Sequence, residues 1–150
     1  MLARPNQRGE SLVWALLRFG VAAVEAQNRV EAMRLLRFVG LEEKTEDLAG
    51  DLSYGQQKLL TLACCLATEA RILLLDEPVA GVHPEMVGHI LGVLRRLRDD
   101  GKLIVFIEHD IGAVRAVADH VIVMDGGKVI AQGPPPDVLE RPEIMEAYLG

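Results

Sequence analysis

The sequence predicts an α/β domain with a largely parallel sheet, preceded by a helical section. Two observations support this fold class. After residue 71, short apolar runs of strand length alternate with longer segments of helical period, whereas the earlier part of the chain shows helical patterns. Half of the 150 residues are hydrophobic and a quarter are charged, which is the composition of a chain that buries a core.

The helical section contains three predicted helices. Residues 11–39 form two of them, with Gly40 where a C-terminal cap belongs. Residues 41–52 are polar and predict a loop or a short helical turn, and the helical pattern returns over 55–70. The apolar positions placed on one face are Val30, Met33 and Leu36 in the second helix and Leu59, Leu62, Ala63 and Leu66 in the third.

Two continuous apolar runs, residues 72–75 and 103–107, are typical of strands that are buried on both faces. A helix begins at Pro84 between them and ends at Gly101. Its inward-facing positions are Val87, Ile90, Leu94 and Leu97. A helical connection of this length joins neighbouring parallel strands.

The remaining elements are shorter. Asp110 is placed to cap a short helix that carries Ile111, Val114 and Val117. Residues 121–124 and 129–131 flank Asp125-Gly126-Gly127-Lys128, which predicts a β-hairpin. Residues 136–149 are expected to form one or two short helices.

Charge and cysteine content narrow the class of protein. The net charge of −6 counts against a nucleic-acid binder, which normally carries a basic patch. Cys64 and Cys65 are adjacent, so they build no disulfide framework and fit a reducing compartment. We expect no secretory leader and a soluble chain, because the apolar stretch 12–24 contains Arg18 and is shorter than the roughly 20 residues of a membrane span. Arg95, Arg96 and Arg98 are expected to form an exposed helix face.

Polar residues follow both predicted strands. Asp76 and Glu77 come after the first, and Glu108, His109 and Asp110 come after the second. Ligands of open parallel sheets bind at this edge, and a pair of acids there suits Mg²⁺-phosphate chemistry. Taken alone, the two acids are equally consistent with the plain end of a strand.

The segment 52–58 opens the third predicted helix. Ser53 is a good N-cap and Gly55 lets a ligand approach the backbone. Free amides at a helix N-terminus favour phosphate. Taken alone, this segment is also explained as a capped helix start.

In combination, these segments resemble a known family. Leu-Ser-x-Gly-Gln, Ile-Leu-Leu-Leu-Asp-Glu-Pro, Gly-Val-His-Pro and Ile-Glu-His-Asp follow one another in the order found in the ATPase subunits of ABC transporters. The resemblance extends from about residue 35 to the end. It implies an incomplete P-loop NTPase-like ABC fold: residues 1–70 as a helical subdomain ending in the signature helix, and residues 71–150 as the C-terminal part of the RecA-like α/β core.

The resemblance also implies roles for individual residues. Residues 72–77 correspond to the Walker B strand, in which Asp76 acts on Mg²⁺ through water and Glu77 is the catalytic base or water-orienting group. His83 lies in the D-loop, and His109 is the switch histidine that senses the ATP γ-phosphate. The residues of the signature segment, which reach the ATP bound by a partner subunit, are Ser53, Tyr54, Gly55 and Gln56.

Tyr54 and the ending 142–150 resemble one branch of the family, the importers of branched-chain amino acids and of small solutes such as urea or amides. The branch implies a second nucleotide-binding subunit, a transmembrane permease and, indirectly, a periplasmic solute-binding protein as partners. The chain is then expected to be peripheral to the cytoplasmic face of the inner membrane, with ATP and Mg²⁺ as cofactors and no nucleic-acid partner.

Three departures from the family pattern stand out. His83 occupies a position that is usually Asp or Asn, and this poorer N-cap is expected to cost roughly 0.5–1 kcal/mol. The expected glutamine loop does not occur. Neither does Gly-x-x-x-x-Gly-Lys-Ser/Thr, since Gly126-Gly127-Lys128 belongs to the hairpin turn.

These departures predict a chain that starts partway through a larger fold. We therefore expect that the chain does not hydrolyse ATP by itself and that its Walker B strand has an unpaired apolar edge. An alternative is a non-catalytic module that lends Ser53 and Gly55 to an intact partner. Glu77 and His109, which such a module does not need, argue mildly against it. A soluble ABC-type ATPase acting on DNA or the ribosome is disfavoured by the acidity and by the importer-like ending.

Overall fold

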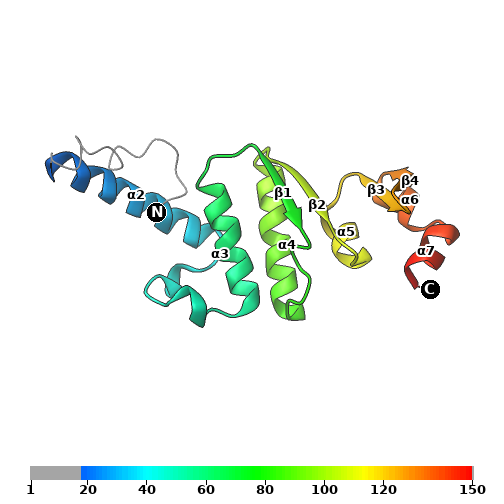
Figure 1. Ribbon diagram of the computed structural model, residues 1–150, viewed down its shortest axis with the longest axis horizontal. Helices are drawn as coiled ribbons and strands as arrows, with labels where there is room; N and C mark the ends of the chain where they lie inside the picture. The colour runs from blue at the N-terminus through cyan, green and yellow to red at the C-terminus, as the bar shows by residue number, and fades with distance from the viewer. Residues whose placement is uncertain (1–17, 150) are drawn as a thin grey trace. The chain divides into compact units, whose positions relative to one another are not determined.

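The computed structural model describes residues 18–149 (Figure 1). The chain divides into two compact units, residues 1–73 and 74–150. The first predicted helix begins in residues that lie outside the described range. The fold class predicted from the sequence is confirmed: helices occupy the first unit, and strands alternate with helices in the second.

The first unit is helical. Helix α2 (Arg18–Phe38) packs against α3 (Tyr54–Leu66), and two short 3-10 turns, η2 (Glu42–Lys44) and η3 (Ala49–Asp51), connect them. Residues 18–38 form one continuous helix. Gly40 ends it with a φ of 75°, and the Leu41 amide donates to the Leu36 carbonyl at 2.8 Å, as expected for a glycine cap.

The buried stripe of α2 differs from the predicted one. Val30 is 71% exposed, so its assignment to the buried face was wrong. Leu35 and Val39 are buried instead, one helical turn apart, together with Leu41. Among the side chains of α2 that the structure describes, the buried one, Leu35, lies in the last turn. Helix α2 packs against α3, and this contact cannot be read from the apolar period of α2 alone.

Helix α3 matches its predicted face and ends earlier than predicted. Leu59, Leu62, Ala63 and Leu66 are buried together with Gly55. The helix stops at Leu66 instead of continuing to residue 70. The Thr68 hydroxyl donates to the Cys65 carbonyl at 2.7 Å, and Glu69 adopts a φ of 60°, which turns the chain out of the helix.

Strands β1 (Ile72–Asp76) and β2 (Leu103–Ile107) form a two-stranded sheet, and α4 (Pro84–Asp99) connects them. The amide of Glu77, directly after β1, donates to the carbonyl of Ile107, the last residue of β2, at 2.9 Å. The carboxyl ends of the two paired strands therefore lie side by side, so the strands are parallel, as predicted.

The two strands are not buried on both faces, contrary to the prediction. Leu73 is 4% exposed, but Leu74 is 76% exposed and Ile107 is 68% exposed. Side chains alternate between the faces of a strand, and among the described residues α4 packs against β2, which leaves alternate positions bare. The exposed apolar residues of the two strands are Ile72, Leu74, Leu103, Val105 and Ile107.

Helix α5 (Ile111–Val117) begins at Asp110, whose Oδ1 accepts the Ala113 amide at 3.1 Å, so the predicted cap is confirmed. Arginines of α4 hold its other end. Arg95 Nε donates to the Ala116 carbonyl at 2.9 Å, and Arg98 Nη1 donates to the Val117 carbonyl at 3.2 Å. Arg95 and Arg98, which were expected to be only exposed residues of α4, thus form a clamp: they donate hydrogen bonds to the carbonyls at the end of α5.

Strands β3 (Val121–Asp125) and β4 (Lys128–Gly133) form the predicted hairpin, a separate antiparallel pair. Gly126 and Gly127 both have positive φ, as a two-residue hairpin turn requires. Helices α6 (Pro135–Leu139) and α7 (Pro142–Leu149) complete the second unit. The buried cluster shared by the hairpin and these helices consists of Val121, Val123, Ala131, Val138, Leu139 and Ile144.

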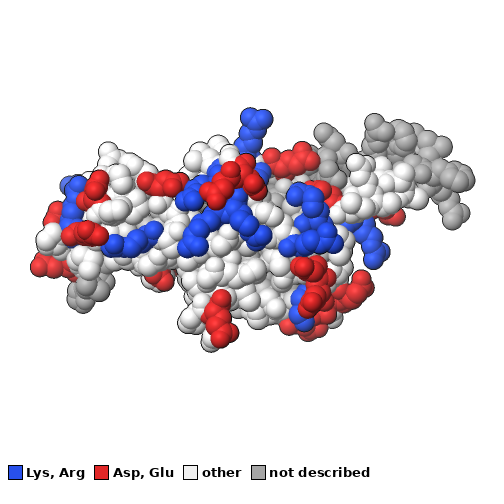
Figure 2. All heavy atoms as spheres, turned by 180° about the vertical axis from the view of Figure 1, so that it is seen from behind, with Lys and Arg blue, Asp and Glu red and all other residues white. Residues whose placement is uncertain are grey.

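Charges on the surface are mixed in sign. Figure 2 shows basic and acidic side chains next to one another on the face it presents. Ion pairs join such charges. Arg98 Nη2 lies 3.0 Å from Asp99 Oδ1, and its Nη1 lies 3.2 Å from Asp119 Oδ1. Arg115 Nη1 lies 3.1 Å from Glu140 Oε1. In the described part of the chain, no helix is long and apolar enough to span a membrane.

Candidate functional site

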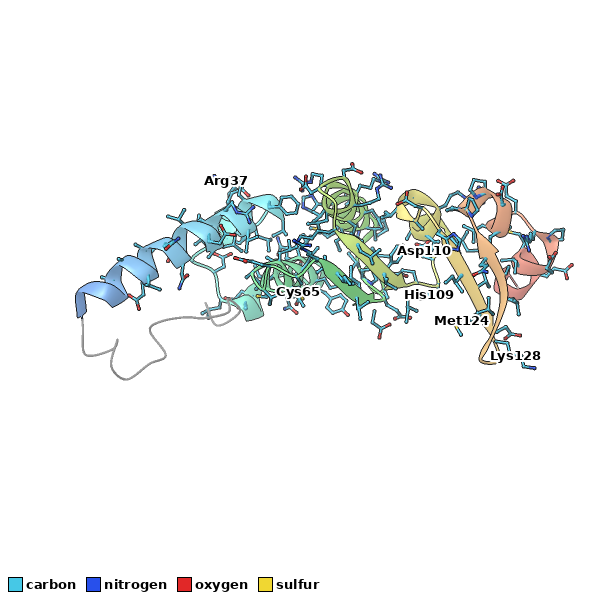
Figure 3. The ribbon with its side chains drawn as sticks, turned by 90° about the horizontal axis from the view of Figure 1, so that it is seen from above. Arg37, Cys65, His109, Asp110, Met124 and Lys128 are labelled. Carbon is cyan, nitrogen blue, oxygen red and sulfur yellow. The ribbon has the colours of Figure 1, made fainter. Side chains whose placement is uncertain are left out.

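Glu77 and His109 meet at the carboxyl edge of the parallel sheet. The Nδ1 atom of His109 lies 3.2 Å from Oε1 of Glu77, although 32 positions separate the two residues in sequence. A carboxylate is a hydrogen-bond acceptor, so this contact places a proton on Nδ1. Both side chains remain accessible, with exposed fractions of 51% for Glu77 and 68% for His109. His109 is labelled with Asp110 in Figure 3, at the junction of β2 and α5.

The backbone of Glu77 is held in an uncommon conformation. Its φ is 45°, a region that residues other than glycine rarely adopt. The Glu77 amide donates to Ile107, and its carbonyl accepts the Ala80 amide at 3.2 Å, so bonds on both sides maintain the turn. Backbone outliers of this kind cluster at active sites, where the surrounding structure holds them.

Asp76 ends β1 directly before Glu77, and its side chain is exposed. Among the described residues, no three His, Cys, Asp or Glu side chains gather closely enough to cage a metal ion. Mg²⁺ does not require such a cage in nucleotide sites, because one carboxylate, water and the substrate phosphates complete its octahedron. A single exposed carboxylate at this edge therefore fits Mg²⁺ held through Asp76.

Glu108 has a contact that sequence reasoning did not assign. Its Oε1 accepts the amide of Val79 at 2.9 Å, and the two residues are 29 positions apart. Its Oε2 is buried and has no hydrogen-bond partner in the part of the chain that the structure describes. An acid immediately before the histidine was the available signal, but the long-range partner was not visible in the sequence.

The predicted signature segment opens α3 in the first unit. Ser53 and Gln56 form a reciprocal capping box: Ser53 Oγ accepts the Gln56 amide at 3.4 Å, and Gln56 Oε1 accepts the Ser53 amide at 2.9 Å. The Gln57 amide donates to the Ser53 carbonyl at 2.9 Å. Within the described range, the amides of Tyr54 and Gly55 have no acceptor, as expected of a first helical turn.

Tyr54 stands out on this segment as an exposed aromatic. Its side chain replaces the small residue that the commoner motif has, and it is 56% exposed. The Lys58 ammonium lies 5.3 Å from the centre of its ring, within the range of a cation–π contact. Gly55 is buried next to it. The segment therefore presents a capped backbone with an aromatic ring and a cation beside it.

His83 is the N-cap residue of α4, and its side chain makes no capping hydrogen bond. This agrees with the expectation that histidine serves poorly at this position. The helix start is instead set by Pro84 at its first position and by the Met86 and Val87 amides, which donate to the His83 carbonyl at 2.9 and 3.1 Å.

The second unit thus brings Asp76, Glu77 and His109 to one edge of the sheet. An accessible carboxylate beside a histidine can accept a proton from water or orient it for attack. The neighbouring carboxylate can hold a cation, so the edge suits phosphoryl transfer to water. Ser53, Tyr54, Gly55 and Gln56 lie in the first unit, at a helix start suited to an anion.

The ABC transporter family model matches residues 4–80 of this chain, about half of its length. Among curated relatives, the high-affinity branched-chain amino acid transport ATP-binding protein BraF of Pseudomonas aeruginosa is 38% identical over 120 residues, which are 79% of this chain and 47% of BraF. The probable branched-chain amino acid transport ATP-binding protein LivG of Archaeoglobus fulgidus is 38% identical over 151 residues, covering 100% of this chain and 58% of LivG. The chain therefore spans about half of these relatives.

Solved structures agree with this match. The ADP conformation of MJ1267, an ATP-binding cassette of an ABC transporter, superposes with a TM-score of 0.74 at 34% identity and covers 80% of this chain and 49% of MJ1267. A nucleotide-free ATP-binding cassette from an ABC transporter gives a TM-score of 0.76 at 31% identity and covers 95% of this chain and 58% of that cassette. On the family match, the relatives and the fold together, the chain belongs to the ABC transporter family.

Proposed function

We propose that this chain supplies the signature segment, the Mg²⁺ carboxylate, the catalytic carboxylate and the switch histidine of a transport ATPase. The observation that carries the proposal is the contact between Glu77 and His109, at 3.2 Å, at the carboxyl edge of the parallel sheet. Residues 1–70 act as the helical subdomain and residues 71–150 as the C-terminal part of the nucleotide-binding core.

Each residue of the edge has one task in this proposal. The substrate is ATP, and Mg²⁺ would neutralise charge on its phosphates when bound. Asp76 would hold the hydrated cation through its carboxylate. Glu77, whose Oε1 contacts His109, accepts the proton of the attacking water. His109 donates from Nδ1 to Glu77, and its remaining ring nitrogen is left to contact the γ-phosphate.

The signature segment acts on the nucleotide of a second subunit. Ser53 and Gln56 hold the helix start in place, while the Tyr54 and Gly55 amides point their partial positive charge toward an approaching phosphate. His83 lies in the loop that leads into α4, between the two subunits of the dimer. A homodimer or heterodimer of nucleotide-binding subunits is therefore part of the proposal.

The transported solute follows from the relatives. BraF and LivG are named as branched-chain amino acid transport ATP-binding proteins, so we assign this chain to import of branched-chain amino acids or similar small solutes. It then works at the cytoplasmic face of the inner membrane, on transmembrane permease subunits that receive solute from a periplasmic binding protein. The non-catalytic alternative is not favoured, because Glu77 and His109 are in contact and the relatives are transport ATP-binding proteins.

The test is a gain of activity. The part of BraF that precedes its match to this chain is fused to residues 1–150, and phosphate release from MgATP is measured for the fusion and for the chain alone. We expect turnover by the fusion and none by the chain alone, because Gly-x-x-x-x-Gly-Lys-Ser/Thr is absent from its 150 residues. Turnover by the isolated chain, or a folded fusion that binds ATP without hydrolysing it, would contradict the proposal.

A further inference from the structure

Glu108 links two loops that carry the proposed catalytic residues. Its backbone lies between Ile107, the last residue of β2, and His109. Its Oε1 accepts the amide of Val79, two residues beyond Glu77, at 2.9 Å. Val79 is 5% exposed, so the acceptor meets a donor that is shielded from water. A hydrogen bond to a charged acceptor is stronger than a neutral one.

The loop that follows Glu77 is a series of tight turns. The Ala80 amide donates to the Glu77 carbonyl and the Val82 amide donates to the Val79 carbonyl, each at 3.2 Å. These bonds are local and do not determine where the loop lies relative to β2. Two hydrogen bonds, one on each side of Pro78, hold the loop against the end of β2. The Glu77 amide donates to the Ile107 carbonyl, and the Val79 amide donates to Glu108.

The second oxygen of Glu108 shows that the contact has a cost. Oε2 is buried and has no partner among the described residues. An unpaired buried carboxylate oxygen loses hydration that nothing replaces. A side chain that only filled space at this position would be more stabilising if it were apolar, because it would not lose this hydration.

We propose that Glu108 is a positioning residue, which fixes the loop after Glu77 against the end of β2 and thereby sets the contact between Glu77 and His109. The inference deepens the proposed function, because the contact that it maintains is the one assigned to catalysis. Glu108 does not itself touch the reacting atoms in this proposal. Its effect passes through the Val79 amide to the turn that holds Glu77.

The experiment uses residues 1–150 and does not depend on ATP. Amide hydrogen exchange at Val79 and the ¹⁵N resonances of the His109 ring are measured by NMR for the parent and for Glu108→Ala, Glu108→Gln and Glu77→Ala. Glu146→Ala on the exposed surface of α7 is the matched control. Glu77→Ala defines the His109 spectrum without the contact.

Glu108→Ala is expected to speed Val79 exchange about tenfold, which corresponds to about 1.4 kcal/mol, because the lost hydrogen bond has a charged acceptor. It is also expected to move the His109 ring signals toward those of Glu77→Ala. Glu108→Gln retains a side-chain oxygen that can accept from the Val79 amide. It should keep the Val79 exchange rate within about threefold of the parent and leave the His109 ring signals at their parental positions. The control should leave both unchanged.

Unchanged Val79 exchange in Glu108→Ala would overturn the inference, and so would faster exchange with parental His109 signals. Glu108→Gln keeps the test decisive where the alanine variant loses its fold, because a folded glutamine variant with the His109 spectrum of Glu77→Ala also overturns it. The outcome is separable from that of the proposed function. An inactive fusion with BraF would refute ATP hydrolysis while leaving both NMR readouts intact.

Discussion

Glu77 and His109 come from the ends of two neighbouring parallel strands, and their side chains meet at 3.2 Å between Oε1 and Nδ1. The bond from the Glu77 amide to the Ile107 carbonyl lies beside this contact and fixes the two strand ends relative to each other. The φ of 45° at Glu77 shows that the backbone leaves the strand conformation at this residue. Two residues that follow neighbouring strands thus form one accessible carboxylate–imidazole unit.

Replacing the histidine tests the unit from one side. In the fusion with BraF, His109→Ala is expected to lower the turnover rate by about 10²-fold or more, because a positioned acid–base group contributes 10²–10⁴-fold. Steady-state phosphate release at saturating MgATP measures the effect. His120→Ala, at an exposed histidine that precedes β3, is the matched control and should keep the parental rate. A parental rate in His109→Ala would remove the histidine from the mechanism.

The capping box of α3 contributes to stability. Ser53→Ala removes the acceptor of the Gln56 amide and should lower the free energy of unfolding of the first unit by about 1 kcal/mol. Urea unfolding followed by circular dichroism measures the loss. Ser53→Asp keeps an acceptor at the N-cap and should stay within about 0.5 kcal/mol of the parent. Equal stability of the alanine variant and the parent would show that the cap makes no net contribution.

His83 leaves room for a gain in stability. Its side chain makes no capping bond at the start of α4, whereas aspartate at an N-cap accepts a first-turn amide. His83→Asp is therefore expected to raise the free energy of unfolding by about 0.5–1 kcal/mol. The same change at His120, which begins no helix, controls for the added charge. A lower urea midpoint in His83→Asp would contradict the capping argument.

The bare apolar positions of β1 and β2 predict self-association. Leu74 is 76% exposed and Val105 is 50% exposed, on strands that lack cover on alternate positions among the described residues. Exposed apolar strands of this kind pair with other chains. Sedimentation velocity should show concentration-dependent association of the chain, reduced in Leu74→Lys/Val105→Lys.

Val30→Lys is the control for that experiment, because Val30 is also an exposed apolar residue but belongs to helix α2 and not to a strand. It should associate like the parent. A parent chain that sediments as a single monomeric species up to high concentration would exclude the association. Association that persists unchanged in the double lysine variant would place it elsewhere on the molecule.

The elements that local chemistry determines could be predicted from the sequence. The hairpin at Gly126-Gly127, the cap at Asp110 and the glycine stop at Gly40 depend on a few neighbouring residues, and the structure contains all three. The strands themselves were also found. Their burial was not, because the exposure of Leu74 depends on what covers the sheet and not on the apolar run.

The candidate site divides in the same way. Asp76, Glu77 and His109 could be singled out because polar residues follow apolar strands, and the parallel strand pair brings their ends together. Glu108 could not be given a role, since its partner Val79 is an amide 29 positions earlier and carries no side-chain signal. The hydrogen bond from Arg95 to the Ala116 carbonyl could not be predicted for the same reason, because a backbone carbonyl carries no side-chain signal in the sequence.

Glu77→Gln in the fusion with BraF tests the central claim most directly, because it keeps the shape of the side chain and removes its ability to accept a proton. Phosphate release from MgATP is measured for this variant and for the parent fusion, with ATP binding measured in parallel. If Glu77 accepts the proton of the attacking water, the turnover rate falls at least about 10²-fold while ATP binding is unchanged. Parental turnover by Glu77→Gln would show that Glu77 is not the proton acceptor.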